Sequence, residues 1–484
     1  MDFSRYKQPG TYYIELTKEN GDVIKSHSFV INEKAISDST LALGLQYFRK
    51  SRTAGEVNKY DAAVPVFNNS NTIRDVRGGW YDASGDISKY FSALAYTNYL
   101  TTQHTPVTVW CLAYIYEQYD AMLHKAKIKE QWAGEITWGA DFLVRMFDKE
   151  GFFYANVFDS WSGQLDKREL CAYSGSKGLK NEAFQCAFRE GGGTAIAALA
   201  RTAGIGLAGE FTADRYRVIA EKAYNHLKEH NLKYCDDGKE NLLDHQYALM
   251  AAVELYTLTK NKDYLKDAHK RAEYILELQD KKGWWYVDSQ KTRAYYHPLE
   301  EGVPVLVLKL LLEVTHINQN PFGYARRSFH YEGVLRHDFF MPRNNETNYW
   351  WAGENGRIGS LAAAALLGSH LLTEKYAAKF QKELKQYAID QIDWILGKNP
   401  FGYCMFRGVG HVNSKDYGHT KYGHTDLDGG IANGIHSANS NGSGIDFITK
   451  DETWRSTEQW IPHTTWYLLA ISVMKDIGKN GVPD

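Results

Sequence analysis

Two acidic residues lie four positions apart in a loop that is rich in glycine and aromatic residues. The loop reads Gly78-Gly-Trp-Tyr-Asp-Ala-Ser-Gly-Asp-Ile-Ser-Lys-Tyr90 and carries Asp82 and Asp86. Two carboxylates held near one point can orient a water molecule and accept its proton. Such a pair can also cap a turn or bind calcium, although a calcium loop normally supplies more oxygen ligands than this segment offers. We therefore expect a general base here, with the capping or calcium-binding pair as the alternative.

A second acidic segment lies near the C-terminal end and reads Asp451-Glu-Thr-Trp-Arg-Ser-Thr-Glu-Gln-Trp-Ile-Pro-His463. Within it, Glu458 stands just before a strongly apolar stretch, with Trp454, Trp460 and His463 nearby. A carboxyl group in aromatic surroundings tends to keep its proton, because burial disfavours the ionised form, and a general acid needs this property. A glutamate in a first helical turn would instead have its pKa lowered by the helix dipole. The spacing leaves both interpretations open.

A third segment, Arg343–Asn355, places Trp350 and Trp351 among amide and carboxylate side chains that include Glu354. Indole faces next to hydrogen-bonding groups suit a carbohydrate, since a sugar ring has an apolar face and a rim of hydroxyls. Aromatic residues make up 14% of the chain, so both sugar-stacking surfaces and a large aromatic core are open interpretations.

Helical periodicity dominates the part of the chain that must position these residues. Apolar residues recur at spacings of three and four from about Ile36 to the end. The expected helices lie near 107–115, 136–146, 194–202, 215–229, 242–259, 263–279, 303–315, 357–368, 375–396 and 458–475. Because no βαβ alternation interrupts them, we expect one large all-α domain over 36–484, and paired helices closing into an α/α barrel would explain their number. Long loops near 65–92, 150–190, 338–356 and 400–457 would form a cleft if they gathered at one end.

Residues 1–35 have a different pattern. A β-rich run from Thr11 to Thr17 and another from Val23 to Ile31 flank the turn sequence Asn20-Gly-Asp22. This pattern predicts a β-hairpin, which is marginal alone in water and must pack on something. It could be the last two strands of a β-sandwich whose earlier strands are missing.

Composition excludes several classes of protein. The 484 residues carry 56 Lys+Arg against 58 Asp+Glu, a formal charge of −2, which disfavours a nucleic-acid binder. No apolar run approaches the roughly 20 residues of a membrane span. The five cysteines are scattered without a CxxC pair, and the histidines near His411 have no metal-ligand spacing, so we expect no metal site there. The first residues lack the apolar stretch of a signal peptide, which predicts a cytoplasmic protein unless a leader was removed.

These motifs together resemble glycoside hydrolase family 9. The family loop Gly-Gly-Trp-Tyr-Asp-Ala-Gly-Asp-x-x-Lys-Tyr/Phe is similar to residues 78–90, with Ser84 as one extra residue. Trp394-Ile-Leu-Gly-Lys-Asn-Pro400 resembles the family segment Leu-Gly-x-Asn-Pro, and Thr457-Glu458 before an apolar helix resembles its Asn-Glu segment. The family's His-His-Arg segment is absent, and Arg407, His411 and 429–434 occupy that region.

The resemblance implies an (α/α)6 barrel preceded by the tail of an immunoglobulin-like module, which we assign to 36–484 and 1–35. It implies Asp86 as general base, Asp82 as its partner in holding water, and Glu458 as general acid. We expect the sugar to contact Trp80, Tyr81, Trp350, Trp351, Glu354, Arg407, His411, Trp454 and Trp460. No cofactor is expected, although a structural calcium ion is possible as in family relatives, which are often secreted.

The resemblance predicts an inverting hydrolase of β-1,4-linked glucans, because the family cleaves such chains with inversion. The form Asp-Ala-Ser-Gly-Asp also resembles a branch that includes exo-β-glucosaminidases acting on chitosan oligosaccharides, so glucan and amino-glucan both remain open. Inversion requires two carboxyl groups about 6.5–9.5 Å apart. The rival hypotheses are a carbohydrate-binding protein without catalysis and, in another enzyme class, a polysaccharide lyase, which is disfavoured because no basic stripe for a polyanion is evident.

Overall fold

The computed structural model describes most of the chain. The described residues are 5–32, 35–95, 100–175, 177–281, 283–315, 352–371, 377–418, 420–439, 444–447 and 454–477. Among them, no helix combines the length and the apolar character that crossing a membrane requires.

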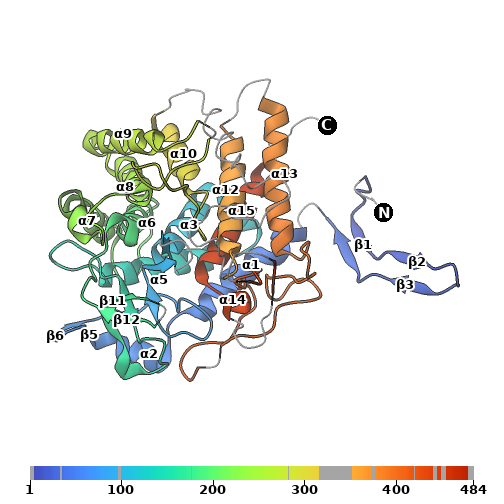
Figure 1. Ribbon diagram of the computed structural model, residues 1–484, viewed down its shortest axis with the longest axis horizontal. Helices are drawn as coiled ribbons and strands as arrows, with labels where there is room; N and C mark the ends of the chain where they lie inside the picture. Colours follow the sequence, from blue (N-terminus) through green and yellow to red (C-terminus); the bar gives the residue numbers. More distant parts are fainter. Residues whose placement is uncertain are drawn as a thin grey trace.

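Six helices form a closed inner ring (Figure 1). They are α3 (Thr105–Gln118), α6 (Gly192–Gly204), α8 (Leu242–Thr259), α10 (Val303–Thr315), α12 (Asn355–Ser369) and α15 (Ile461–Ile477). Each packs on the next, and α15 returns to α3. These helices are apolar around most of their circumference, because protein covers them on every side. The ring confirms the expected barrel.

A second layer of helices covers the ring from outside. α1 (Ala35–Ser51) packs on α15, α5 (Lys129–Arg145) on α3, α7 (Ala213–Tyr234) on α6, α9 (Lys262–Glu277) on α8, and α13 (Ala377–Ile395) on α12. The sequence of α9 explains its place in the outer layer. It buries Tyr264, Ala268, Ala272 and Ile275 along one stripe and leaves polar residues on the opposite, solvent-facing side. Among the described residues, five of the six inner helices thus each pair with one outer helix, as in an (α/α)6 barrel. Shorter helices are α2 (Gly55–Tyr60), α4 (Asp120–Lys125) and α14 (Trp454–Thr457), with 3-10 turns η1 (Asp61–Ala63), η2 (Leu165–Lys167) and η3 (Phe188–Glu190).

Two of the loops expected from the sequence contain β-structure. β5 (Val64–Val66), β6 (Asn69–Arg74), β7 (Lys89–Tyr90), β10 (Asn156–Phe158), β11 (Glu169–Ser174) and β12 (Leu179–Asn181) form one sheet in the order β6-β5-β11-β10-β7, with β12 beside β11. A separate hairpin pairs β8 (Ser92–Ala95) with β9 (Leu100–Gln103). Several of these strands have only two to four residues, too few for an alternating pattern to predict them. β10 pairs with β7, which directly follows the Asp82–Asp86 loop.

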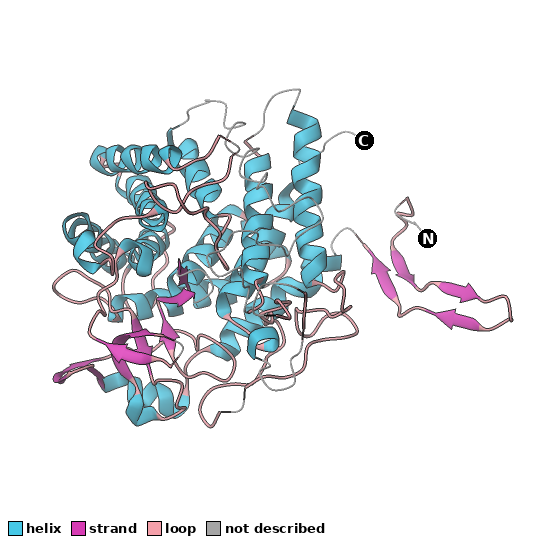
Figure 2. Cartoon of the chain, viewed as in Figure 1, coloured by secondary structure: helices cyan, strands magenta, loops and turns pink. Residues whose placement is uncertain are grey.

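The N-terminal residues form the expected hairpin, which projects from the side of the helical body (Figures 1 and 2). β1 (Gly10–Tyr12) pairs with β4 (Phe29–Ile31), and β2 (Glu15–Thr17) pairs with β3 (Val23–Lys25). The turn between β2 and β3 uses Gly21 at φ +88°, a conformation that glycine adopts without strain. The hairpin contacts the barrel through His411, whose ring stacks on His27 at 4.2 Å between centroids.

The residues that precede the inner helices meet at one end of the barrel. Gln103, before α3, donates its side-chain amide to the Arg189 carbonyl before α6 at 2.6 Å. The Gln103 backbone N–H donates to Glu300 Oε1, before α10, at 2.8 Å. Loops distant in sequence therefore gather at the N-terminal end of the inner ring, where the two acidic segments also lie.

Candidate active site

The Asp82–Asp86 loop is a tight turn fixed at both ends. The Asp82 N–H donates to the Ser88 carbonyl at 3.1 Å, and the Asp86 N–H donates to the Ala83 carbonyl at 3.3 Å. Gly85 has φ +79°, and a Cβ atom there would lie 2.8 Å from the Gly418 Cα atom. The turn therefore requires glycine at this position for both conformation and space.

Two donors orient the Asp86 carboxyl group. The Ser88 N–H donates to Oδ1 at 2.8 Å, and the Tyr90 hydroxyl donates to Oδ2 at 3.0 Å. Burial and then the nearby charge of Asp159 raise the pKa of Asp86 to about 7. Asp159 is fully buried and accepts a hydrogen bond from the Ser88 hydroxyl at 2.7 Å. Asp86 is thus a fixed carboxyl group that titrates near neutral pH, as a general base requires.

A histidine that the sequence analysis did not select holds Asp82. His104 lies immediately before α3, and its Nδ1 atom is 2.5 Å from Asp82 Oδ1. Its other ring nitrogen, Nε2, is 2.9 Å from the Thr102 hydroxyl. Both Asp82 and His104 are buried. Thr102, His104 and Asp82 thus lie in a row of close polar contacts, and no spacing pattern connects residues 22 positions apart to reveal it.

Glu458 lies in the break between α14 and α15, beside the Asp82–Asp86 loop. The Ile461 N–H donates to the Asp82 carbonyl at 3.1 Å, and Ala83 forms an antiparallel β-bridge with Trp460. The two acidic segments from opposite ends of the chain therefore converge.

The surroundings of Glu458 favour its protonated form. Burial raises its pKa well above the usual value, and the charges of Asp86 and Asp82 raise it further. The Trp460 indole N–H donates to Glu458 Oε2 at 2.5 Å, which opposes this shift in part. The first-turn alternative does not apply, because Glu458 precedes the first residue of α15 and its pKa is raised, not lowered. Glu458 therefore favours its protonated form beside the Asp82–Asp86 loop, and a carboxyl group in this state can act as a general acid.

Aromatic rings lie on both sides of these carboxyl groups. Trp460 stacks on His463 with 5.7 Å between ring centroids and 7° between planes, and its centroid is 5.9 Å from that of His104. On the Asp86 side, Trp161 donates its indole N–H to the Tyr90 hydroxyl at 3.0 Å and is 43% exposed. Trp161 is an accessible flat ring one contact from Asp86. The sequence analysis missed it, although its Ser-Trp-Ser-Gly setting within 150–190 was a usable signal.

Comparison with known proteins now assigns the family. The sequence profile described as "Glycosyl hydrolase family 9" matches residues 38–443, which is most of the chain. The protein belongs to glycosyl hydrolase family 9. A search of curated proteins finds no match.

Solved structures of family 9 enzymes share the fold. The cellulase Cel9M of C. cellulolyticum has a TM-score of 0.61 at 16% identity, covering 91% of this chain and 98% of that chain. A Bacteroides ovatus GH9 protein has a TM-score of 0.60 at 18% identity, covering 99% and 88%. The endoglucanase CelQ from Clostridium thermocellum, complexed with cellotriose, has a TM-score of 0.56 at 16% identity, covering 92% and 71%.

Two of the aromatic residues expected to bind sugar lie inside this family 9 enzyme. Trp80 has no exposed surface and donates its indole N–H to Glu135 Oε2 at 3.2 Å. Tyr81 is 4% exposed and donates its hydroxyl to the Tyr422 carbonyl at 2.9 Å. The prediction that these two side chains contact the sugar is wrong, because both are packed in the interior and their polar groups already have partners.

Of the other residues expected to bind sugar, some lie beside the acidic residues and others lie away from them. Trp460 adjoins the acids, whereas Trp454 lies in α14 and its carbonyl accepts from the Asn433 amide at 2.7 Å. Arg407 pairs with Asp416. His411 is exposed and contacts the hairpin, with its Nε2 3.0 Å from the Ser28 carbonyl. Trp350 and Trp351 lie outside the described residues.

Glu354 occupies the buried position before α12. It is 4% exposed, accepts a hydrogen bond from the Tyr296 hydroxyl, and lies 3.9 Å from the Arg357 guanidinium. Burial raises its pKa to about 7. The next residue, Asn355, donates its N–H to the Asn433 carbonyl at 3.1 Å, and the Asn433 N–H donates to the Glu458 carbonyl at 2.8 Å. Glu354 is thus linked to the acid segment through the backbone, and its contact with sugar stays a prediction.

A further carboxyl group that the sequence analysis missed, Asp426, influences Glu458. Asp426 is 5% exposed, and its Oδ2 accepts from the Tyr417 N–H at 3.1 Å. Burial raises the pKa of Asp426 to about 7, and its charge contributes to the raised pKa of Glu458. Among the described residues, no group of three or more His, Cys, Asp or Glu side chains could hold a metal ion. A calcium site stays a prediction.

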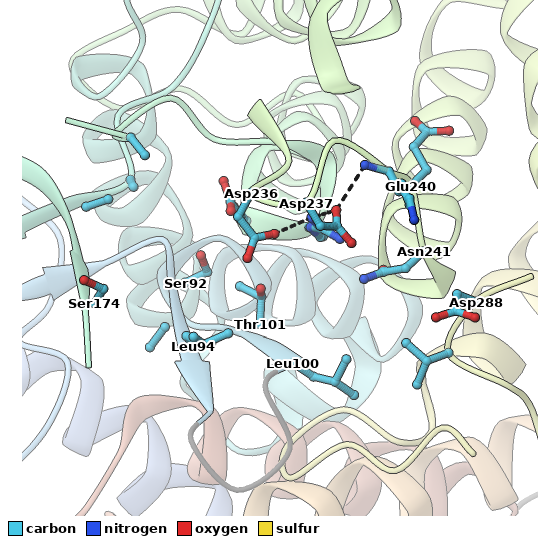
Figure 3. Close-up of a pocket in the computed structure, with 18 of the residues that line it drawn as sticks. Ser92, Leu94, Leu100, Thr101, Ser174, Asp236, Asp237, Glu240, Asn241 and Asp288 are labelled. Atoms are coloured by element: carbon cyan, nitrogen blue, oxygen red, sulfur yellow. Dashed lines mark hydrogen bonds and ion pairs between the residues drawn. The ribbon is translucent and has the colours of Figure 1, made fainter. Parts of the chain in front are cut away.

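A cavity of about 670 Å³ lies between the β8–β9 hairpin and the residues that precede α8 (Figure 3). Tyr173, one of its lining residues, lies 5.6 Å from Tyr90 between ring centroids, and Tyr90 holds Asp86. The ionisable side chains in the lining are Arg189, Glu190, Asp236, Asp237, Lys239, Glu240, Asp288 and Arg293. Five of these eight are acidic, but burial raises the pKa of Glu190 to about 8, so near neutral pH four carboxylates face three cations.

Proposed function

We propose that this protein hydrolyses β-1,4-glycosidic bonds of oligosaccharides with inversion at the anomeric carbon. The observation that carries the proposal is the convergence of the Asp82–Asp86 loop with Glu458, through the Ile461-to-Asp82 hydrogen bond and the Ala83–Trp460 bridge. Family membership and the cellulases among the similar structures support a glucan-type substrate.

In this mechanism Asp86 removes a proton from a water molecule that Asp82 helps to orient. The water oxygen bonds to the anomeric carbon while the bond to the leaving oxygen breaks. Glu458 gives its proton to that oxygen, so the leaving sugar departs as a neutral alcohol. Asp86 ends the cycle protonated and Glu458 ionised, and exchange with solvent resets both groups. His104 keeps Asp82 in place throughout.

Two substitutions test this assignment. Asp86→Asn and Glu458→Gln should each lower kcat on a natural oligosaccharide by roughly 10²–10⁴-fold, because each removes one proton-transfer group. Asp214→Asn, an exposed change on α7, serves as the control and should leave kcat unchanged. Near wild-type turnover in either site variant would refute the assignment. Oligosaccharide binding without any new reducing ends would instead indicate a non-catalytic binding protein.

The acid-rich cavity favours a second candidate substrate, an oligosaccharide of glucosamine. A protonated amine is attracted to carboxylates, and Asp236, Asp237 and Glu240 lie together on one side of the cavity (Figure 3). Asp236 and Asp237 share the guanidinium of Arg189 at 2.6 and 2.8 Å. Asp288 lies elsewhere in the lining and caps the Gln290 N–H at 2.8 Å.

A product profile on cello-oligosaccharides beside chitosan oligosaccharides decides between the two substrates. Release of monomer from chitosan oligosaccharides alone would support an exo-β-glucosaminidase. In that case Asp288→Asn should raise KM for the chitosan chain and leave the stability of the protein unchanged. Cleavage of cello-oligosaccharides alone would exclude the amino-sugar candidate.

A further inference from the structure

The extra residue of the acidic loop connects it directly to the acid segment. The Ser84 N–H donates to the Gln459 carbonyl at 2.9 Å, and the Gln459 N–H donates to the Ser84 hydroxyl oxygen at 2.9 Å. Ser84 and Gln459 are both fully buried. Ser84 lies two residues before Asp86, and Gln459 directly follows Glu458. This reciprocal pair is therefore a short hydrogen-bonded connection between the backbones that carry the base and the acid.

The Gln459 side chain extends this connection to a third segment. Its Oε1 accepts from the Leu427 N–H at 2.8 Å, and its Nε2 donates to the Leu427 carbonyl at 2.9 Å. A Cβ atom at Gly430 would lie 2.3 Å from Gln459 Oε1, so the amide is packed against bare backbone. The same segment also holds the acidic loop, since the Gly85 N–H donates to the His424 carbonyl at 2.8 Å. Three chain segments thus meet at one buried amide.

We propose that Ser84 and Gln459 are positioning residues that set the place of Glu458 relative to Asp86. The inference rests on the proposed function, because it assigns these residues a role in that same proton-transfer pair. A displacement of about 1 Å in a reacting group can cost 10²-fold in rate. Removing the Ser84 hydroxyl leaves the buried Gln459 N–H without its acceptor. Because an unpaired buried N–H is costly, we expect the backbone at Gln459 to move toward another acceptor, and Glu458 to move with it.

Ser84→Ala is the direct test, measured on substrates with poor and good leaving groups. On an oligosaccharide, whose leaving oxygen needs the proton of Glu458, kcat should fall about 10–100-fold with KM within about twofold. On the 2,4-dinitrophenyl glycoside of the disaccharide that the enzyme cleaves, kcat should fall less than about threefold, since that leaving group departs without protonation. Ser84→Thr, which keeps the hydroxyl, should restore most of the oligosaccharide rate.

A matched control separates positioning from packing. Ser472→Ala removes a buried hydroxyl that donates to the Leu468 carbonyl at 2.7 Å, deeper in α15. Ser472→Ala should leave unchanged the ratio of kcat on the oligosaccharide to kcat on the dinitrophenyl glycoside. Circular dichroism should show that Ser84→Ala and Ser472→Ala are both folded. Wild-type kcat in Ser84→Ala, or equal losses on both substrates, would overturn the positioning role. If Glu458→Gln is inactive while Ser84→Ala is normal, this inference fails and the proposed function stands.

Discussion

Trp460 donates its indole N–H to Glu458 Oε2 at 2.5 Å, and the same ring stacks on His463. The acid therefore carries its own hydrogen-bond donor from two residues further along the chain. A donor to a carboxylate favours the ionised form, whereas burial and the neighbouring acids favour the protonated form. The pKa of Glu458 is raised because burial outweighs the indole.

Removing this donor should extend the activity to higher pH. In Trp460→Phe, the ionised form of Glu458 loses its hydrogen bond, so its pKa rises further and the acid stays protonated at higher pH. The alkaline limb of the kcat/KM profile should therefore move upward. Trp285→Phe, which removes an indole donor to the Ile275 carbonyl at 3.1 Å, is the control and should not move that limb. A downward shift in Trp460→Phe would contradict the account.

The acidic limb of the same profile should report Asp86. Because the base must be ionised, activity should fall as the pH drops through about 7, the pKa that burial and Asp159 give to Asp86. Asp159→Asn removes the neighbouring charge, so the pKa of Asp86 should decrease and the limb should move to lower pH. An unchanged limb would show that Asp159 exerts no effect on the base.

The raised pKa of Asp86 should also affect stability. Its ordinary value is 3.8 and its value in the folded protein is about 7, so the folded state binds the extra proton between these values. Stability from this group is complete below about pH 4 and is lost as the pH rises through 7. Asp86→Asn should therefore be more stable than the wild type at pH 8, by on the order of 2–4 kcal/mol. Urea unfolding at pH 4 and pH 8 measures the difference, and a variant less stable at pH 8 would contradict it.

A buried ion cluster beneath the acidic loop should be essential for folding. Asp61 accepts from Arg168 through both of its oxygens at 2.9 Å and contacts Lys89 Nζ at 2.6 Å, and all three side chains are fully buried. Arg168 also donates to the Ile87 carbonyl within the loop. Asp61→Asn should destabilise the protein by about 3–5 kcal/mol, because it leaves two buried cations without their anion.

Urea unfolding measures this loss at Asp61. The control is Glu56→Gln, which breaks an exposed pair with Lys59 and should have no measurable effect. Equal stability of the two variants would show that the buried cluster does not support the loop.

The sequence predicts those parts of this protein in which local pattern and long-range packing agree. Helix α10 was expected at 303–315 and lies there, because an almost wholly apolar stretch of this length is typical of a buried helix. The acidic segments were selected because paired carboxylates can activate water and because a carboxyl group in aromatic surroundings tends to keep its proton. Trp80 was misassigned because a tryptophan next to Asp82 has the same local sequence whether it faces the cleft or the core. The Trp80 ring faces the core because it packs against Gly139 of α5, which is distant in the sequence.

The supporting residues could not be predicted for a similar reason. His104, Asp159 and Asp426 reach the acids from three separate segments, and nothing in their neighbouring sequence distinguishes them from other buried polar residues. Only the closure of the barrel brings them together.

The configuration of the first product tests the central claim most directly. If Asp86 activates water on the face of the sugar opposite to Glu458, a β-linked oligosaccharide must give the α-anomer first. Proton NMR of the reaction during the first minutes, before mutarotation, distinguishes the two anomers. The account predicts an initial α-anomer signal that later equilibrates, and an initial β-anomer would contradict it.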